Sequence, residues 1–326
     1  AQRSAFCLRA STVEVATGRA GPRMAIWLIV FATAVAATQG AILAGWLDVS
    51  DARQLSGAGS MSGALIGGVM FGIGMVLARG CASRLLVLSA TGNLRALVTG
   101  LLLTLVAQSA YTGILAPARE GISRLWLIEG PERDLLQASG LTRPVVFAIA
   151  LAGLLAALLL ARSRGVRPMA SVAGIFVGLS ITLGWYLTYL IARTSFEIVP
   201  VSSVTFTGPS TDTLMAFVTQ TSVPFSFGIG LVPGVFVGAA AAALYAGEWK
   251  IQRFSSDTPM ERYLVGAVLM GFGAMLAGGC AVGATVSGGA VMSLTAWVAG
   301  ASMWAGGMGT ALLLGRMSVL KPAATA

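Results

Sequence analysis

Three cysteines, Cys7, Cys81 and Cys280, are the residues of this 326-residue sequence best suited to chemistry on a soft solute. A neutral thiol is a weak hydrogen-bond donor, and a thiolate is a nucleophile. The sequence contains no histidine, which excludes Ser-His-Asp triads, histidine metal sites and histidine proton relays. The cysteines form no CxxC pair and lack the spacing of zinc ligands, so we expect neither a metal site nor a cofactor.

Two of these cysteines lie in a repeated segment. Residues 66–82 read IGGVMFGIGMVLARGCA and residues 265–281 read VGAVLMGFGAMLAGGCA, with nine identities at a constant offset of 199. Part of this agreement reflects the abundance of glycine and alanine, but the cysteine after Leu-Ala-X-Gly is specific. The triplet Ala-Gly-Trp at 44–46 is matched by Ala-Gly-Glu-Trp at 246–249. The pattern predicts an internal duplication with repeat cores at 24–118 and 224–315.

The composition restricts the fold class. Hydrophobic residues make up 56% of the chain and charged residues 10%, with 42 glycines. Soluble domains carry about 25% charged residues, so a water-soluble enzyme is excluded. The composition is typical of an all-α polytopic membrane protein in which small residues let helices approach closely. We predict one transmembrane domain over residues 1–326 and, because the chain does not begin with methionine, further native residues upstream.

The apolar stretches predict eight transmembrane spans, each close to the length of about 20 residues that crosses a bilayer. Residues 119–143 carry mixed charge and predict an interfacial helix followed by a turn, and residues 194–212 predict a polar connection. The expected spans are Met24–Trp46, Gln54–Ala78, Ala96–Ala118, Pro144–Ala161, Met169–Ala192, Pro224–Gly247, Tyr263–Ala277 and one that begins near Met292.

Basic residues gather at alternate connections and account for the net charge of +9. The clusters lie in the first 23 residues and at 79–95, 162–167, 250–262 and 316–321. The positive-inside rule places them, and both ends of the given chain, in the cytoplasm. Binding to nucleic acid is the weaker interpretation, because no basic block has interleaved aromatic residues. An odd number of crossings separates the repeat cores, which predicts an inverted repeat, the usual framework of secondary transporters.

Each repeat leads into a glycine-rich break beside its cysteine. Gly80 and Gly279 permit backbone conformations that an intact helix does not. Irregular backbone at membrane depth is tolerated only where it is buried in protein or lines a cavity. We therefore expect two loops dented into the membrane, Cys81 from the inside and Cys280 from the outside, in an hourglass-like arrangement. For a single cysteine in a membrane helix the simpler interpretation is an apolar filler.

Short helices are expected to restart after the breaks, at about Ser83–Ala90 and Ala284–Ala290. Their N-terminal N–H groups carry partial positive charge and favour an anion. Arg79 and Arg84 add positive potential on the inner side, although anchoring at the lipid headgroups explains them equally well.

These residues carry a resemblance to the YeeE/YedE sulfur-transport family, over most of the chain. The paired Leu-Ala-Arg-Gly-Cys-Ala and Leu-Ala-Gly-Gly-Cys-Ala motifs are the most specific part, and Gln-Arg-Ser-Ala-Phe-Cys near the N-terminus is weaker. The resemblance implies a multi-pass protein of the bacterial inner membrane that takes up thiosulfate. It further implies that Cys81 is the central thiol, Cys280 the outer one and Cys7 an inner relay, and that a small cytoplasmic carrier of the TusA type receives the sulfur.

Thiosulfate is a dianion with a soft terminal sulfur, and a pore lined wholly by arginines would hold it too tightly, since conduction needs weak sites in series. Two alternatives stay open. One is a membrane thiol–disulfide or sulfurtransferase enzyme that uses the three cysteines as nucleophiles. The other is a channel or exporter for selenium or other sulfur species, because the family includes members linked to selenium metabolism.

Overall fold

The computed structural model describes residues 6–18, 20–196, 199–219, 226–252 and 260–320, with side chains up to residue 315. Its long helices are α2 (Pro22–Leu43), α3 (Met61–Leu77), α5 (Leu94–Tyr111), α8 (Arg143–Ser163), α9 (Pro168–Thr194), α11 (Phe227–Tyr245), α12 (Met260–Leu276) and α14 (Leu294–Leu320). The shorter elements are α1 (Leu8–Ala16), β1 (Gly59–Ser60), α4 (Ala82–Ala90), α6 (Ala116–Ser123), β2 (Leu127–Ile128), the 3₁₀ helix η1 (Gly130–Arg133), α7 (Leu135–Ser139), α10 (Thr207–Thr219), the π-helical η2 (Ala281–Ser287) and α13 (Gly288–Ala290).

Eight helical segments in the described part of the chain are long and apolar enough to cross a membrane. This confirms the predicted all-α polytopic fold and the number of spans. The second segment runs through α3 and α4 to Ala90, and the seventh runs through α12, η2 and α13 to Ala290. The expected start of the sixth span at Pro224 lies outside the described residues, as do parts of the terminal and 250–262 basic clusters.

Besides the start of the second span, which lies at Met61 and not at Gln54 because residues 53–60 form turns and β1, two of the expected boundaries are wrong. The third span ends at Tyr111 and not at Ala118, because the chain turns at residues 112–115 and continues as the separate helix α6. The expected polar connection up to Asp212 is helical from Thr207, where α10 begins. In both places a short helix lies beside a polar turn, so the hydropathy of the sequence does not mark where it begins.

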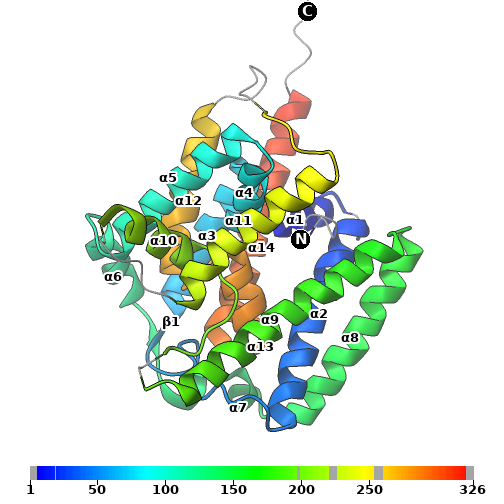
Figure 1. The fold of residues 1–326 in the computed structure, drawn as a ribbon, viewed down its shortest axis with the longest axis vertical. Coiled ribbons are helices and arrows are strands. Elements are labelled where there is room, and N and C mark those ends of the chain that lie inside the picture. The colour runs from blue at the N-terminus through cyan, green and yellow to red at the C-terminus, as the bar shows by residue number, and fades with distance from the viewer. Residues whose placement is uncertain (1–5, 19, 197–198, 220–225, 253–259, 321–326) are drawn as a thin grey trace, which may run out of the picture.

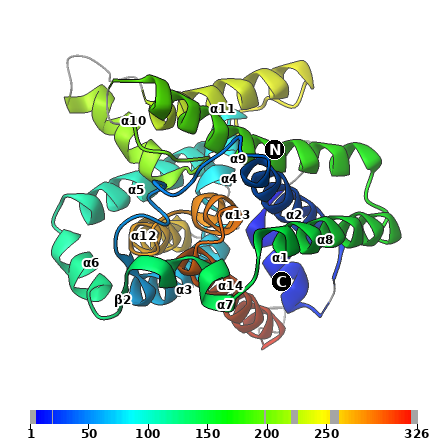
Figure 2. The same cartoon turned by 90° about the horizontal axis from the view of Figure 1, so that it is seen from below.

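The centre of the molecule is a close packing of α3 against α12 and α14 (Figure 2). Glycines bring the backbones together: a Cβ atom at Gly74 would lie 2.6 Å from the carbonyl oxygen of Gly266, and one at Gly67 would lie 2.6 Å from that of Gly273. The matching glycines on α3 and α12 are therefore a packing interface between the two repeated segments.

The other long helices surround this centre. α2 packs against α8 and α9 on one side, and α10 and α11 lie against α4 and α5 on the other (Figures 1 and 2). Trp27 of α2 stacks on Phe31 at 5.2 Å and meets Trp304 of α14 edge-on, which joins α2 to the centre. Large apolar side chains such as Leu155 and Val237 are exposed on the periphery, as expected for a surface that faces lipid.

The connections between α2 and α3 and between α5 and α8 are tied together at one end of the molecule. β1 pairs antiparallel with β2, and Arg133, which is 4% exposed, donates hydrogen bonds to the carbonyl oxygens of Ser56 and Gly57. These contacts hold the 47–60 loop in place next to the central helices.

We expect Gly74→Ala to destabilise the protein, because the added methyl group has no room beside the Gly266 carbonyl. Overpacking of this kind costs about 1–3 kcal/mol. Gly153→Ala on α8 is the matched control, since nothing lies within 4 Å of its Cβ position. It should be neutral or stabilising by up to about 1 kcal/mol through helix propensity. Thermal unfolding in detergent checks whether Gly74→Ala lowers the Tm while Gly153→Ala does not. Equal Tm values for the two variants would contradict the packing argument.

Candidate functional site

The two breaks have the same local structure. α3 ends at Leu77 and α12 at Leu276, and each helix is followed by a residue in the left-handed region, Arg79 with φ 56° and Gly278 with φ 77°. The cysteine comes two residues later in both places and is the residue that precedes the next helix. The short helices expected after the breaks are therefore present, as α4 and as η2 with α13.

The backbone of the breaks differs from the expectation in one detail. The left-handed residues stand one position before Gly80 and Gly279, so the conformational freedom of glycine is used at Gly278. Arg79 takes the same conformation with a side chain, at a cost of roughly 1–2 kcal/mol. Gly279 is required for space, because a Cβ atom there would lie 3.0 Å from the amide nitrogen of Ala284.

The helical segment after Cys280 contains one residue more than the one after Cys81. After Cys81, the helix α4 has 9 residues. After Cys280, the helix η2 has 7 residues and is followed directly by the 3 residues of α13. The additional residue is accommodated by a π-helical turn that begins directly after Cys280. Single π-turns are rare and occur mostly at functional sites.

The thiols of Cys81 and Cys280 are buried in one core cluster, with exposures of 4% and 0%. Cys81 lies 3.3 Å (Sγ to Oγ) from Ser83, and the backbone N–H of Phe206 donates to the Sγ of Cys280 at 3.4 Å. Cys7 is half-buried at the start of α1. The Cys81 thiol interacts electrostatically with both other cysteines, so the fold brings all three into one region.

Residues from both breaks line a cavity of about 320 Å³ beside the cysteines. Ser83 and Arg84 enter it from α4, and Val282 and Phe206 approach from the Cys280 side. Most of its remaining lining is apolar and comes from α9 and α11. The cavity gives the two breaks a shared space inside the protein.

Side chains from neighbouring elements make hydrogen bonds to the segment that follows Cys280. Gln39 donates from Nε2 to the carbonyl oxygen of Ala290 at 2.8 Å, and Trp185 donates from Nε1 to that of Ser287 at 3.3 Å. The hydroxyl of Ser287 donates to the carbonyl oxygen of Val204 at 2.6 Å. The contacts from Gln39 and Trp185 satisfy carbonyl groups at the ends of α13 and η2 that a continuous helix would bond internally. Ser287 ties η2 to the segment at Val204. These contacts hold the chain that follows Cys280 without adding charge.

The arginines next to the Cys81 break differ in exposure. Arg79 is exposed and Arg84 is half-buried. Arg53 was not expected to take part, but its Nη2 donates to the carbonyl oxygen of Gly278 at 3.3 Å. It also lies close enough to Arg133 that, together with burial, it lowers the pKa of that guanidinium. No spacing in the sequence identifies Arg53, because the 47–60 loop reaches the break only through its tertiary contacts.

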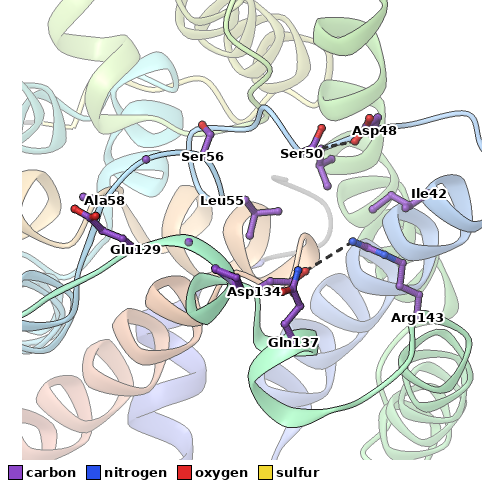
Figure 3. Close-up of a pocket in the computed structure, with 14 residues that line it drawn as sticks. Ile42, Asp48, Ser50, Leu55, Ser56, Ala58, Glu129, Asp134, Gln137 and Arg143 are labelled. Carbon is purple, nitrogen blue, oxygen red and sulfur yellow. Dashed lines mark hydrogen bonds and ion pairs between the residues drawn. The ribbon is translucent and has the colours of Figure 1, made fainter.

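A larger cavity of about 690 Å³ opens at the 47–60 loop, away from the cysteines (Figure 3). Its charged lining consists of Asp48, Glu129, Asp134 and Arg143, and Arg143 lies 3.8 Å from Asp134 (Nη2 to Oδ2). Hydrogen bonds from Ser50 hold the pKa of Asp48 below its ordinary value, so this carboxylate is ionised at neutral pH. The lining is net acidic and therefore unsuited to a divalent anion.

The chain is similar in sequence to known proteins. The chain is 27% identical over 264 residues to the thiosulfate transporter TsuA of Escherichia coli strain K12, which covers 74% of this chain and 72% of that protein. It is 26% identical over 252 residues to the thiosulfate transporter TsuA of Spirochaeta thermophila, covering 74% of each. The profile of the family described as "Sulphur transport" matches residues 3–309, nearly the whole chain. The protein is thus a multi-span membrane protein that belongs to the sulphur transport (YeeE/YedE) family.

Proposed function

We propose that this protein imports thiosulfate across the bacterial inner membrane and passes it along Cys280, Cys81 and Cys7. The thiols donate weak S–H···S contacts to the terminal sulfur, and no bond of the ion is formed or broken. The observation that carries the proposal is the burial of Cys81 and Cys280 in one core cluster, with Cys7 in electrostatic range. The names of the two relatives support thiosulfate as the substrate.

The electrostatics of the breaks suit an ion that must be bound and then released. α4 begins directly after Cys81 and η2 directly after Cys280. A helix N-terminus is equivalent to roughly half a positive charge, so the two together offset about half of the charge of a dianion. Arg79 is exposed and Arg84 is, among the described residues, the one arginine that lines the shared cavity, so the ion is attracted without being held by several arginines at once. Weak thiol donors then supply selectivity for sulfur.

The orientation of the chain is part of the same proposal. The two repeat cores, 24–118 and 224–315, run in opposite directions, with the Cys280 loop entering from the outside and the Cys81 loop from the cytoplasm. The matched left-handed residues and the equal placement of the cysteines support a duplicated unit. The ends of the given chain then lie in the cytoplasm, where a small carrier of the TusA type receives the ion.

Cys81→Ala is expected to lower thiosulfate uptake into proteoliposomes by at least about tenfold, the factor for the loss of roughly 1.4 kcal/mol at one step of the relay. A cell that depends on this protein for thiosulfate should then fail to grow on it as sole sulfur source. Ser302→Ala, which also shortens a buried polar side chain but on the α3–α14 interface, is the control and should transport normally. Wild-type uptake by a correctly inserted Cys81→Ala protein would overturn the relay.

Competition uptake tests the substrate. With competitors added only to the outer face, unlabelled thiosulfate should block uptake of radiolabelled thiosulfate. Sulfate should inhibit at least about tenfold more weakly, because it has no soft sulfur to accept an S–H contact. Selenite or sulfite that competed as well as thiosulfate, and was itself transported, would reassign the protein to the selenium or general sulfur-anion alternative.

A further inference from the structure

A second group of residues gathers on the side of the molecule that carries α1, the start of α12 and the Cys81 break. The guanidinium of Arg9 interacts electrostatically with those of Arg79 and Arg262, which come from three different elements. Among the described residues, none of these three arginines forms an ion pair with a carboxylate. The cluster therefore holds positive charge that the described part of the protein does not neutralise.

Tyr263 lies in the same group and has an unusual environment. Its side chain is 2% exposed, and its hydroxyl has no hydrogen-bond partner among the described residues. The guanidinium of Arg95 covers the ring at 4.8 Å from the centroid, and the phenol interacts electrostatically with Arg9. A buried hydroxyl without a partner is unfavourable, so such a group in a native structure calls for a ligand or another explanation.

Arg9 also has a buried polar atom without a hydrogen-bond partner in the described part of the chain. Its Nε is buried and has no partner among the described residues. Burial and the neighbouring Arg79 and Arg262 lower the pKa of Arg9, although an arginine remains protonated at neutral pH. An anion at this position would accept from the Nε of Arg9 and from the Tyr263 hydroxyl, and would offset the repulsion between the guanidinium groups.

We propose that Arg9, Arg79 and Tyr263 form an inner binding site for a divalent tetrahedral oxyanion. In its application to thiosulfate the site rests on the proposed function. Cys7 stands two residues before Arg9 at the start of α1. The oxygen end of the ion binds at Arg9 and Tyr263 while its terminal sulfur lies at the Cys7 thiol. Because the Tyr263 side chain is only 2% exposed, the carboxylates of an acidic protein do not reach its hydroxyl, which leaves a small ion as the ligand of this site.

The test uses the purified full chain in detergent, with sulfate as the probe and gluconate at matched ionic strength as the reference. Sulfate should raise the Tm of the wild type and of Cys81→Ala alike, because sulfate binding at this site needs no thiol. Tyr263→Phe and Arg9→Gln should each weaken the apparent sulfate affinity by about tenfold or more, as expected for a lost charge-assisted contact. Arg164→Gln is the control, since it removes an exposed arginine from the loop between α8 and α9.

Tyr263→Phe separates ligand binding from a structural role. Removing an unpartnered buried hydroxyl should leave the Tm without sulfate unchanged or raise it, so a loss of sulfate affinity reports on the ligand. Unchanged sulfate affinity in this variant, or a wild-type Tm that does not respond to sulfate, would overturn the inner site. If Arg9→Gln does not fold, Arg9→Lys keeps the charge but lacks the Nε donor and should still bind sulfate more weakly. Thiosulfate uptake by Cys81→Ala bears on the relay alone, so the two proposals fail separately.

Discussion

The structure depends on one constraint: backbone that leaves the helical hydrogen-bond pattern inside the membrane must be shielded from lipid and satisfied by protein. The cysteine of each break is buried, whereas Arg79 and Gly278 two residues earlier are exposed. The glycine contacts between α3 and α12 bring the two broken segments together, and Gln39 and Trp185 bond to carbonyl groups near the end of the outer one. Contacts from the surrounding helices thus compensate for the helical hydrogen bonds that are lost where the two helices are interrupted. The result is a pair of buried thiols on irregular backbone.

The two breaks share a backbone plan but differ in charge. At the position where the Cys280 break has Gly278, the Cys81 break has Arg79, which takes the left-handed conformation despite its side chain. An arginine from another segment reaches the Cys280 break, because Arg53 donates to the Gly278 carbonyl. The two breaks therefore have similar backbones but different distributions of positive charge, since the arginine belongs to the break itself at Cys81 and to a separate loop at Cys280.

Much of the fold can be predicted from local sequence, because the length and hydropathy of a segment predict a span and its glycines predict a break. The cysteine-bearing breaks and the eight spans are of this kind. The boundary at Tyr111 and the helix α10 are not, since a short helix next to a polar turn has no hydropathy signal. The group around Tyr263 cannot be predicted from the sequence for a different reason. Arg9, Arg79 and Arg262 lie far apart in the sequence, and they become neighbours only through the packing of α1, the Cys81 break and α12.

An inward path for a dianion works against the membrane potential, which costs about 2.3 kcal/mol per elementary charge for each 100 mV when the cell interior is negative. Thiols of weak donor strength do not offset that cost, nor do two helix N-termini. Under the proposed function, an unneutralised cluster of guanidinium groups at the inner end lowers the energy of the bound ion where the potential raises it most, although the net cost of import is unchanged. The same cluster would retain the ion if it were as buried as the thiols. Arg79 is exposed, so water reaches it, and under the proposed function the ion can leave the cluster at this end.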